Sequence, residues 1–119
     1  MKYESKDATN ITNIIVVITT TDSREEAQRI ARAMVEKRLA ACAQVSGPIE
    51  SHFHWDNRID RAEEWQCKFK TAQGKYPELE RAIVEMHSYE VPQVVAFPVT
   101  MAFKAFAQWV YEETVKKTA

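Results

Sequence analysis

Three histidines are the side chains of this 119-residue chain best suited to bind a metal. A neutral imidazole is a good ligand for Cu(II) or Zn(II). His87 stands at the predicted end of a helix, just before a polar loop, and is the strongest single candidate. The competing interpretation is that a protonated His87 caps that helix, because a positive charge there suits the helix dipole.

His52 and His54 form a second candidate pair, separated by one residue in a predicted strand. Side chains alternate across a strand, so both rings should share one face, opposite Phe53 and Trp55. Two imidazoles at this spacing could hold one metal in a weak site open to solvent. The alternative is that both are solvated histidines without a ligand.

The two cysteines, Cys42 and Cys67, form no CxxC motif and no zinc-finger spacing. They are predicted to pack as small buried hydrophobic residues rather than to build a structural metal site. No nucleophile lies in a recognisable motif, and two glycines are too few for a glycine-rich phosphate loop. We therefore expect no catalytic residues and no enzyme activity.

The elements that must position these residues follow from hydrophobic patterning. Residues 14–18 are continuously apolar and β-branched, which predicts a buried strand. Asp22 and Ser23 offer a helix N-cap, and the apolar spacing that follows predicts a helix to about Leu39.

A long hairpin should follow that helix. Strand character begins near Cys42, is interrupted at Gly47-Pro48 as a bulge or bend, and resumes to Trp55. Residues 56–58 form a turn, and a second long strand runs from Ile59 to about Thr71. Strands of this length should overhang a small domain, and their edges would need a partner.

The last third of the chain predicts a helix that opens near Pro77 and ends by Ser88, then a short strand at residues 94–97. A final helix is predicted from about residue 102 to 116. Four residues are expected to form or broaden its apolar face: Phe103, Phe106, Trp109 and Val110.

This order of elements predicts an α+β fold, the ferredoxin-like β-α-β-β-α-β sandwich with an extra C-terminal helix and a long hairpin between its second and third strands. We expect one domain over residues 13–119 and a flexible tail at residues 1–12. The sheet face away from the helices would still show Phe53, Trp55 or Trp65, which indicates that more than one chain assembles.

The net charge and the hydropathy pattern limit which kinds of partner and which location are expected for the chain. The net charge of −1 favours neither nucleic acid nor an anionic membrane as a partner. The longest apolar run, residues 14–18, is far too short to span a bilayer. The polar first twelve residues lack the apolar stretch of a signal peptide, so a cytoplasmic location is expected.

Three segments taken together resemble the divalent-cation tolerance family, often called CutA. They are residues 38–43 (RLAACA), Phe53-His54-Trp55 with its following turn and Ile59, and residues 87–92 (HSYEVP). The resemblance implies a ferredoxin-like fold that forms a tight homotrimer through its hairpins. This chain departs from the family pattern at Ser88, where proline is usual, and at Thr19, where some members have cysteine.

The resemblance further implies that the protein binds copper or another divalent cation, by sequestration or sensing, with His87 as its ligand. The rival hypothesis is a trimeric small-molecule sensor or interaction scaffold, similar to PII-type signalling proteins, with incidental metal binding. Its ligand would occupy a cleft between subunits, lined by Trp55, Lys70, Tyr89 and Glu90.

Overall fold

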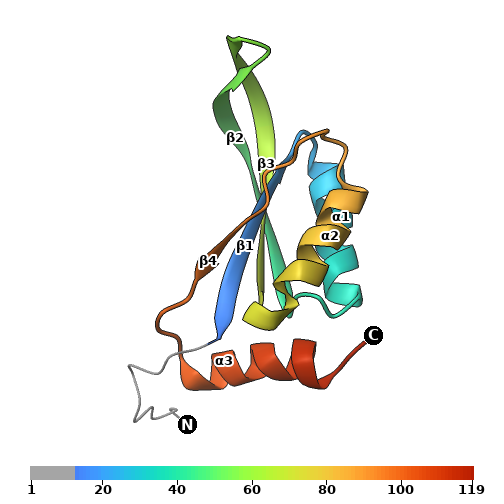
Figure 1. The fold of residues 1–119 in the computed structure, drawn as a ribbon, viewed down its shortest axis with the longest axis vertical. Coiled ribbons are helices and arrows are strands. Elements are labelled where there is room, and N and C mark those ends of the chain that lie inside the picture. Colours follow the sequence, from blue (N-terminus) through green and yellow to red (C-terminus); the bar gives the residue numbers. More distant parts are fainter. Residues whose placement is uncertain (1–12) are drawn as a thin grey trace.

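A computed structural model describes residues 13–119, and the structural statements below concern that part of the chain. The prediction of a flexible tail at residues 1–12 lies outside it. The elements in chain order are β1 (Ile14–Thr21), α1 (Arg24–Glu36), β2 (Cys42–Trp55), β3 (Arg58–Ala72), a 3₁₀ turn (Gln73–Lys75), α2 (Tyr76–Met86), β4 (Val95–Pro98), α3 (Lys104–Tyr111) and a π-helical turn (Glu112–Lys116) (Figure 1). The predicted α+β order is confirmed.

The four strands form one antiparallel sheet in the order β2-β3-β1-β4. Strand β1 pairs with β3 from Ile14 opposite Ala72 to Thr21 opposite Trp65. Beyond Thr21 no third strand of the described residues lies beside the β2-β3 hairpin, which projects past the rest of the sheet (Figure 1). The predicted overhang of the hairpin is therefore confirmed.

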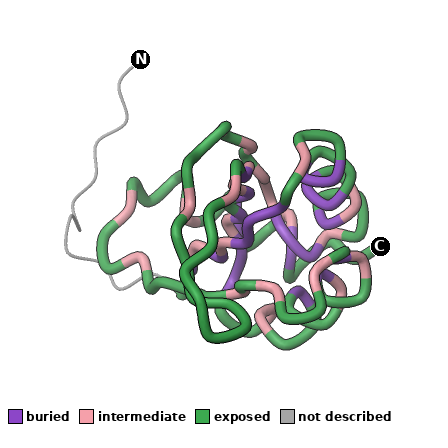
Figure 2. Tube along the Cα trace, turned by 90° about the horizontal axis from the view of Figure 1, so that it is seen from above, coloured by how far each residue is buried: buried purple, intermediate pink, exposed green. Residues whose placement is uncertain are grey.

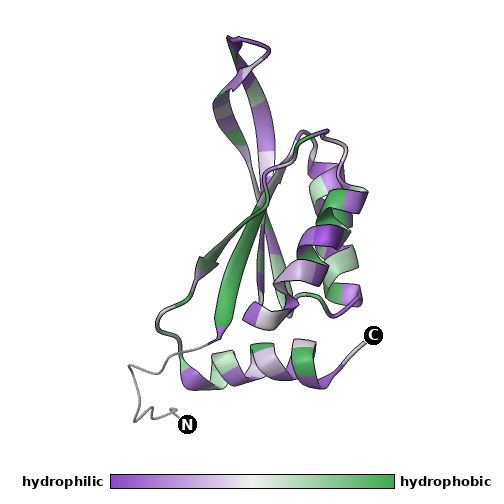
Figure 3. Ribbon diagram, viewed as in Figure 1, coloured by the Kyte–Doolittle hydropathy of each residue, from purple (hydrophilic) through white to green (hydrophobic). Residues whose placement is uncertain are grey.

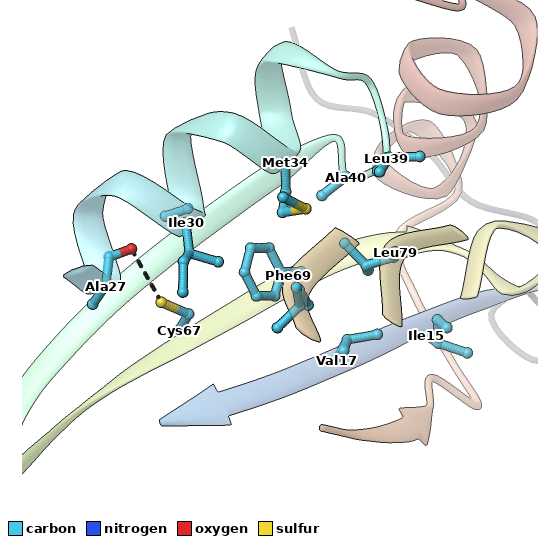
Figure 4. Packing of buried hydrophobic residues seen from close by; sticks show 12 residues of the cluster. Ile15, Val17, Ala27, Ile30, Met34, Leu39, Ala40, Cys67, Phe69 and Leu79 are labelled. Carbon is cyan, nitrogen blue, oxygen red and sulfur yellow. Dashed lines mark hydrogen bonds between the residues drawn. The ribbon is translucent and has the colours of Figure 1, made fainter. Parts of the chain in front are cut away.

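Helices α1 and α2 cover one face of the sheet, and the core lies between the two layers (Figures 1 and 4). Alternation along β3 directs Cys67 and Phe69 toward the helices, and neither has any exposed surface. The cluster is completed by residues of β1, α1, the α1-β2 link and α2: Ile15, Val17, Ala27, Ile30, Ala31, Met34, Leu39, Ala40, Leu79 and Ile83.

Burial and hydropathy change together along the sheet. Buried positions gather where the helices meet the sheet, whereas the outer segments are exposed (Figure 2). Strand β1 is hydrophobic over most of its length, and the projecting end of the hairpin is mostly hydrophilic (Figure 3). No helix within residues 13–119 is long and apolar enough to cross a membrane.

The predicted bulge in β2 is present, as a register shift between Ser46 and Ile49. Gly47 has a φ of 149°, a conformation that residues with a side chain rarely adopt. A Cβ atom there would lie 2.6 Å from Cδ1 of Trp65. Only glycine fits this position without moving the Trp65 ring, which packs against the core rather than on the uncovered face.

Helix α1 ends at Glu36, so the predicted end near Leu39 is wrong by three residues. The cause is Arg38, which takes a left-handed conformation with a φ of 57°. This turns the chain so that the backbone N–H groups of Leu39 and Ala40 both donate to the carbonyl of Met34. These bonds satisfy the helix end in the way a glycine cap usually does.

The predicted apolar face of α3 is only partly right. Val110 is buried, together with Thr114 one turn later, whereas Phe103, Phe106 and Trp109 are 52%, 39% and 42% exposed. The helix lies across the end of the sheet rather than over a face (Figure 1), so only a narrow row of its residues is covered.

Candidate functional site

His87 is the C-cap of α2, and its side chain is completely buried. Its Nδ1 atom lies 3.1 Å from the backbone N of Tyr89, and its Nε2 atom lies 2.8 Å from the carbonyl oxygen of Thr20. Because a backbone N–H can only donate, Nδ1 must accept, and the ring proton belongs on Nε2. His87 is therefore held as the neutral tautomer, with both nitrogens engaged.

This arrangement bears on both interpretations of His87. The ring contacts β1 and the following loop and not the last carbonyls of α2, so it is not a charged helix cap. A metal at Nδ1 would have to replace the N–H of Tyr89. A carboxylate oxygen of Glu26 lies 3.9 Å from the same nitrogen, so a cation there would have a negative charge beside it.

Glu26 ties the start of α1 to the loop after α2. Its backbone N–H donates to the hydroxyl of the N-cap Ser23, at 3.1 Å. In a capping box the glutamate side chain would return to the N-cap backbone. Here the carboxylate, which is only 4% exposed, accepts the backbone N–H of Ser88 at 2.7 Å and its hydroxyl at 2.9 Å.

Tyr89 extends this network to the hairpin. Its hydroxyl donates to Oε2 of Glu64 at 2.6 Å, and its ring centroid lies 4.9 Å from that of His87. Burial, followed by the bond to Glu64, raises the pKa of the Tyr89 phenol well above its usual value, so it stays a donor at neutral pH. Glu64 is 7% exposed.

A hollow of about 680 Å³ lies between the projecting part of the hairpin, the end of β1 and the loop after α2; we call it the hairpin hollow. Four carboxylate residues from separate parts of the chain line it: Asp22, Asp60, Glu64 and Glu90. No Lys or Arg of residues 13–119 contributes to its lining. The hollow should therefore carry a negative potential that attracts cations.

The same hollow has an aromatic side. Phe53 and Trp55 line it from β2, and Tyr89 lines it from the loop. The structure thus brings together Trp55, Tyr89 and Glu90 of the predicted cleft. It does not bring Lys70 there, because Lys70 lies six residues beyond Glu64 on β3 and its ammonium contacts the side-chain oxygen of Gln44.

His52 and His54 lie on the projecting hairpin and are exposed, and His52 is among the residues that line the hairpin hollow. Nε2 of His52 lies 2.6 Å from Glu50, whose other oxygen accepts a bond from Arg61 at 2.8 Å. Arg61, and then His52, lower the pKa of the Glu50 carboxyl. Within residues 13–119, no three His, Cys, Asp or Glu side chains are placed to hold a metal together.

The cysteines add no ligand to the site. Cys67 is fully buried and donates to the carbonyl of Ala27 at 3.3 Å. Burial, followed by the charge of Glu26, raises the pKa of the Cys67 thiol to about 11, so it is not the thiolate that binds metals at neutral pH. Cys42 is a free, half-buried thiol.

Sequence reasoning placed His87 and Tyr89 correctly at a loop that gathers polar groups, but it assigned no site role to Glu26 or Glu64. The Ser23-x-x-Glu26 spacing was a usable signal, although it suggests a local cap rather than a bond to Ser88. Nothing in the local pattern marks Glu64, since its burial depends on a loop that is distant in sequence.

Comparison with known proteins identifies the family to which the chain is similar. Residues 15–113 match the model of the family described as CutA1 divalent ion tolerance protein. The chain is 40% identical over 97 residues to the divalent-cation tolerance protein CutA of Archaeoglobus fulgidus, covering 82% of this chain and 93% of that one. It is 33% identical over 99 residues to the protein of the same name from Thermus thermophilus, covering 83% and 96%.

Solved structures give the same result. The crystal structure of CutA1 from Shewanella sp. SIB1 superposes with a TM-score of 0.84 at 34% identity, covering 89% of this chain and 99% of that one. CutA1 from Oryza sativa superposes with a TM-score of 0.85 at 26% identity, covering 90% and 98%. The likeness extends over nearly the whole described chain.

Proposed function

Because the chain belongs to the CutA1 divalent ion tolerance family, we propose that it binds a divalent cation, with copper as the first candidate, and acts by sequestration or sensing rather than by catalysis. The observation that carries the proposal is the charge of the hairpin hollow. Its carboxylates come from three separate segments, and no Lys or Arg of residues 13–119 lines it. A cytoplasmic location remains a prediction.

The carboxylates attract the ion, and His87, whose buried ring lies next to that of Tyr89 but does not itself line the hollow, is proposed as its inner ligand. Imidazole nitrogen suits Cu(II) better than carboxylate oxygen alone. Since Nε2 of His87 donates to Thr20, the nitrogen that could bind is Nδ1, after release of the Tyr89 N–H. Metal binding at His87 should therefore move Tyr89, whose hydroxyl is held by Glu64.

We further propose that the protein works as a homotrimer, the number being taken from the family resemblance. Strands β2 and β4 are the edges of the sheet, and both leave backbone groups to be paired. Large apolar side chains are exposed on both: Ile49 of β2 is 36% and Phe97 of β4 is 53% exposed. A neighbouring chain would cover this surface. Light scattering coupled to gel filtration tests the number.

The test of the metal site is a Cu(II) titration against a chromophoric competitor. Wild type, His87→Ala and the double variant His52→Ala/His54→Ala are compared, with circular dichroism to confirm folding. We expect His87→Ala to weaken binding at least about tenfold, the effect of losing one good ligand, and the double variant, which removes one exposed imidazole from the lining of the hollow, to weaken it less. Loss of binding in the double variant alone would make copper binding a surface property of the hairpin.

A second candidate function is favoured by the size of the hairpin hollow. At about 680 Å³ it falls within the range of small-molecule pockets and far exceeds the volume of a bare ion. Trp55, Tyr89 and Glu90 all line it. We therefore keep a trimeric small-molecule sensor, analogous to the PII-type proteins, as the alternative.

A further inference from the structure

We propose that the hairpin hollow binds a small organic ammonium compound, meaning an amine or quaternary amine carried on an apolar stem. This inference rests on the second candidate function, small-molecule sensing, and names the chemical class of its ligand. It is carried by three features that meet in the hollow: a buried carboxylate without a counter-charge, an aromatic wall and a sufficient volume.

The buried carboxylate is Glu64. It is 7% exposed, and its Oε2 atom accepts the hydroxyl of Tyr89. No Lys, Arg or His of residues 13–119 lies within ion-pair distance of it. A buried charge is costly unless it is paired. An ammonium group in the hollow would provide the missing positive charge, next to the oxygen that Tyr89 leaves free.

Tyr89 prepares this carboxylate for a cation. As a phenol it donates to one oxygen of Glu64 and fixes the orientation of the carboxylate. The Tyr89 ring is itself held against the buried ring of His87. The acceptor in the hollow is thus set on rigid neighbours, which lowers the ordering cost of binding.

The aromatic wall distinguishes an organic cation from a metal ion. Phe53 is 39% exposed and Trp55 is 49% exposed, and both line the hollow. An aromatic face attracts ammonium and quaternary ammonium groups but supplies no ligand to a divalent metal. The absence of any three grouped metal ligands in the described chain favours the organic cation for this part of the site.

The register of the hairpin places the two kinds of group opposite each other. Phe53 is paired with Asp60 across the hairpin, and the neighbouring pair on the same face is Ser51 with Ala62. The small side chains of Ser51 and Ala62 leave room next to the ring of Phe53. Arg58 lies opposite Trp55 but is not among the residues that line the hollow. A cationic head between carboxylates with its stem on Phe53 and Trp55 fits this layout.

The experiment is isothermal titration calorimetry on the full chain in the oligomer that it forms, in phosphate buffer free of amines. The probes are choline and spermidine, with glutarate and ATP as anionic controls. We expect saturable binding of the two cations only. Glu64→Gln should weaken it about tenfold or more, the effect of losing one charged hydrogen bond.

Two further variants keep the test independent of folding at Glu64. Glu90→Gln, at an exposed lining position, should also weaken binding severalfold, and Trp55→Ala should weaken it about fivefold through the lost cation–π contact. The matched control Glu78→Gln removes an exposed carboxylate of α2 outside the hollow and should change nothing.

The outcomes separate this inference from the functions proposed above. Trp55→Ala should weaken choline binding but leave the copper affinity unchanged, because its ring supplies no ligand to a divalent metal. If ATP or glutarate binds in a Trp55-dependent manner and the amines do not, the ligand class is overturned while a sensor remains. If no probe binds, or if Glu64→Gln, Glu90→Gln and Trp55→Ala all bind choline like wild type, the organic-cation site is overturned.

Discussion

The two halves of strand β3 share an extended backbone but differ in their neighbouring strands and in their burial. From Trp65 to Ala72 the strand pairs with β1, residues 66–70 also pair with β2, and helices α1 and α2 cover one of its faces (Figure 1). From Arg58 to Glu64 it pairs with β2 alone and is exposed over most of its length. The first half forms the core, and the second half forms a wall of the hairpin hollow.

The comparison teaches that alternation alone does not decide burial. Phe69 and Trp55 are both large aromatic residues on strands of the same hairpin, yet Phe69 has no exposed surface and Trp55 is half exposed. The difference is the cover that helices supply to one and not to the other. Where cover is missing, aromatic and acidic side chains remain available for a ligand or a neighbouring chain.

The largest expected effect tests this contrast directly. Phe69→Ala should lower the free energy of unfolding by about 3–5 kcal/mol, because it leaves a cavity in a packed core. Trp55→Ala should lower it by less than about 1 kcal/mol, since half of the side chain is already in water. Urea unfolding measures both. Equal losses would mean that an assembled neighbour buries Trp55 as deeply as the core buries Phe69.

Substitution of Gly47, which lies in β2 opposite the boundary between the two halves of β3, sharpens the comparison. Gly47→Ala should destabilise the protein by about 2–3 kcal/mol, because its φ is positive and the new Cβ would meet Trp65 at 2.6 Å. Gly74→Ala is the matched control, with nothing within 4 Å, and should be neutral or slightly stabilising. Thermal unfolding of both variants decides. A harmless Gly47→Ala would show that the bulge is not held tightly.

The network beside the hollow should respond next. Ser88→Ala removes the hydroxyl that donates to the buried carboxylate of Glu26 and should cost about 1–3 kcal/mol. The backbone N–H of residue 88 still donates, so the fold should survive. Ser46→Ala, at an exposed position, is the control and should stay within about 0.5 kcal/mol of wild type. Chemical denaturation that fails to separate the two variants would argue against a structural role for Glu26.

The smallest effect is expected on the projecting hairpin, from Glu50→Gln. Arg61 and then His52 lower the folded-state pKa of Glu50 below its unfolded value, so the stabilisation is present above that unfolded value and is lost as pH falls through the folded one. Wild type should therefore lose slightly more stability on acidification than the variant. Because the ion pair is exposed, salt should abolish the difference. A pH series of urea unfolding, with Glu85→Gln as the control, measures it.

Most of the fold could be predicted because each element has a local signal. The β-branched run of β1, the Gly47-Pro48 interruption and the Ser23 cap all produced the predicted structures. The errors arose where long-range geometry overrides local pattern. Arg38 ends α1 early by adopting a conformation more typical of glycine, and α3 lies across the end of the sheet, so its aromatic residues stay exposed.

The site could be predicted only in part, and for the same reason. His87 and Tyr89 stand out because polar, chemically capable residues follow a helix. Glu64 and Glu26 become site residues only when the loop after α2 folds back against both the hairpin and the start of α1. Lys70 shares the strand of Glu64 but lies six residues away, in the half flanked by β1. Contacts of this kind depend on tertiary structure.

The change from two flanking strands to one along β3 has a kinetic consequence. Backbone amides of residues 66–70 are enclosed by ladders on both sides, whereas those near Arg58 and Asp60 are held by β2 alone. Amide hydrogen exchange should therefore grow slower from the tip of the hairpin toward Phe69, as the strand frays from its free end. A ligand bound in the hollow would restrain this part of the hairpin. Its binding should therefore slow amide hydrogen exchange from residue 60 to residue 64.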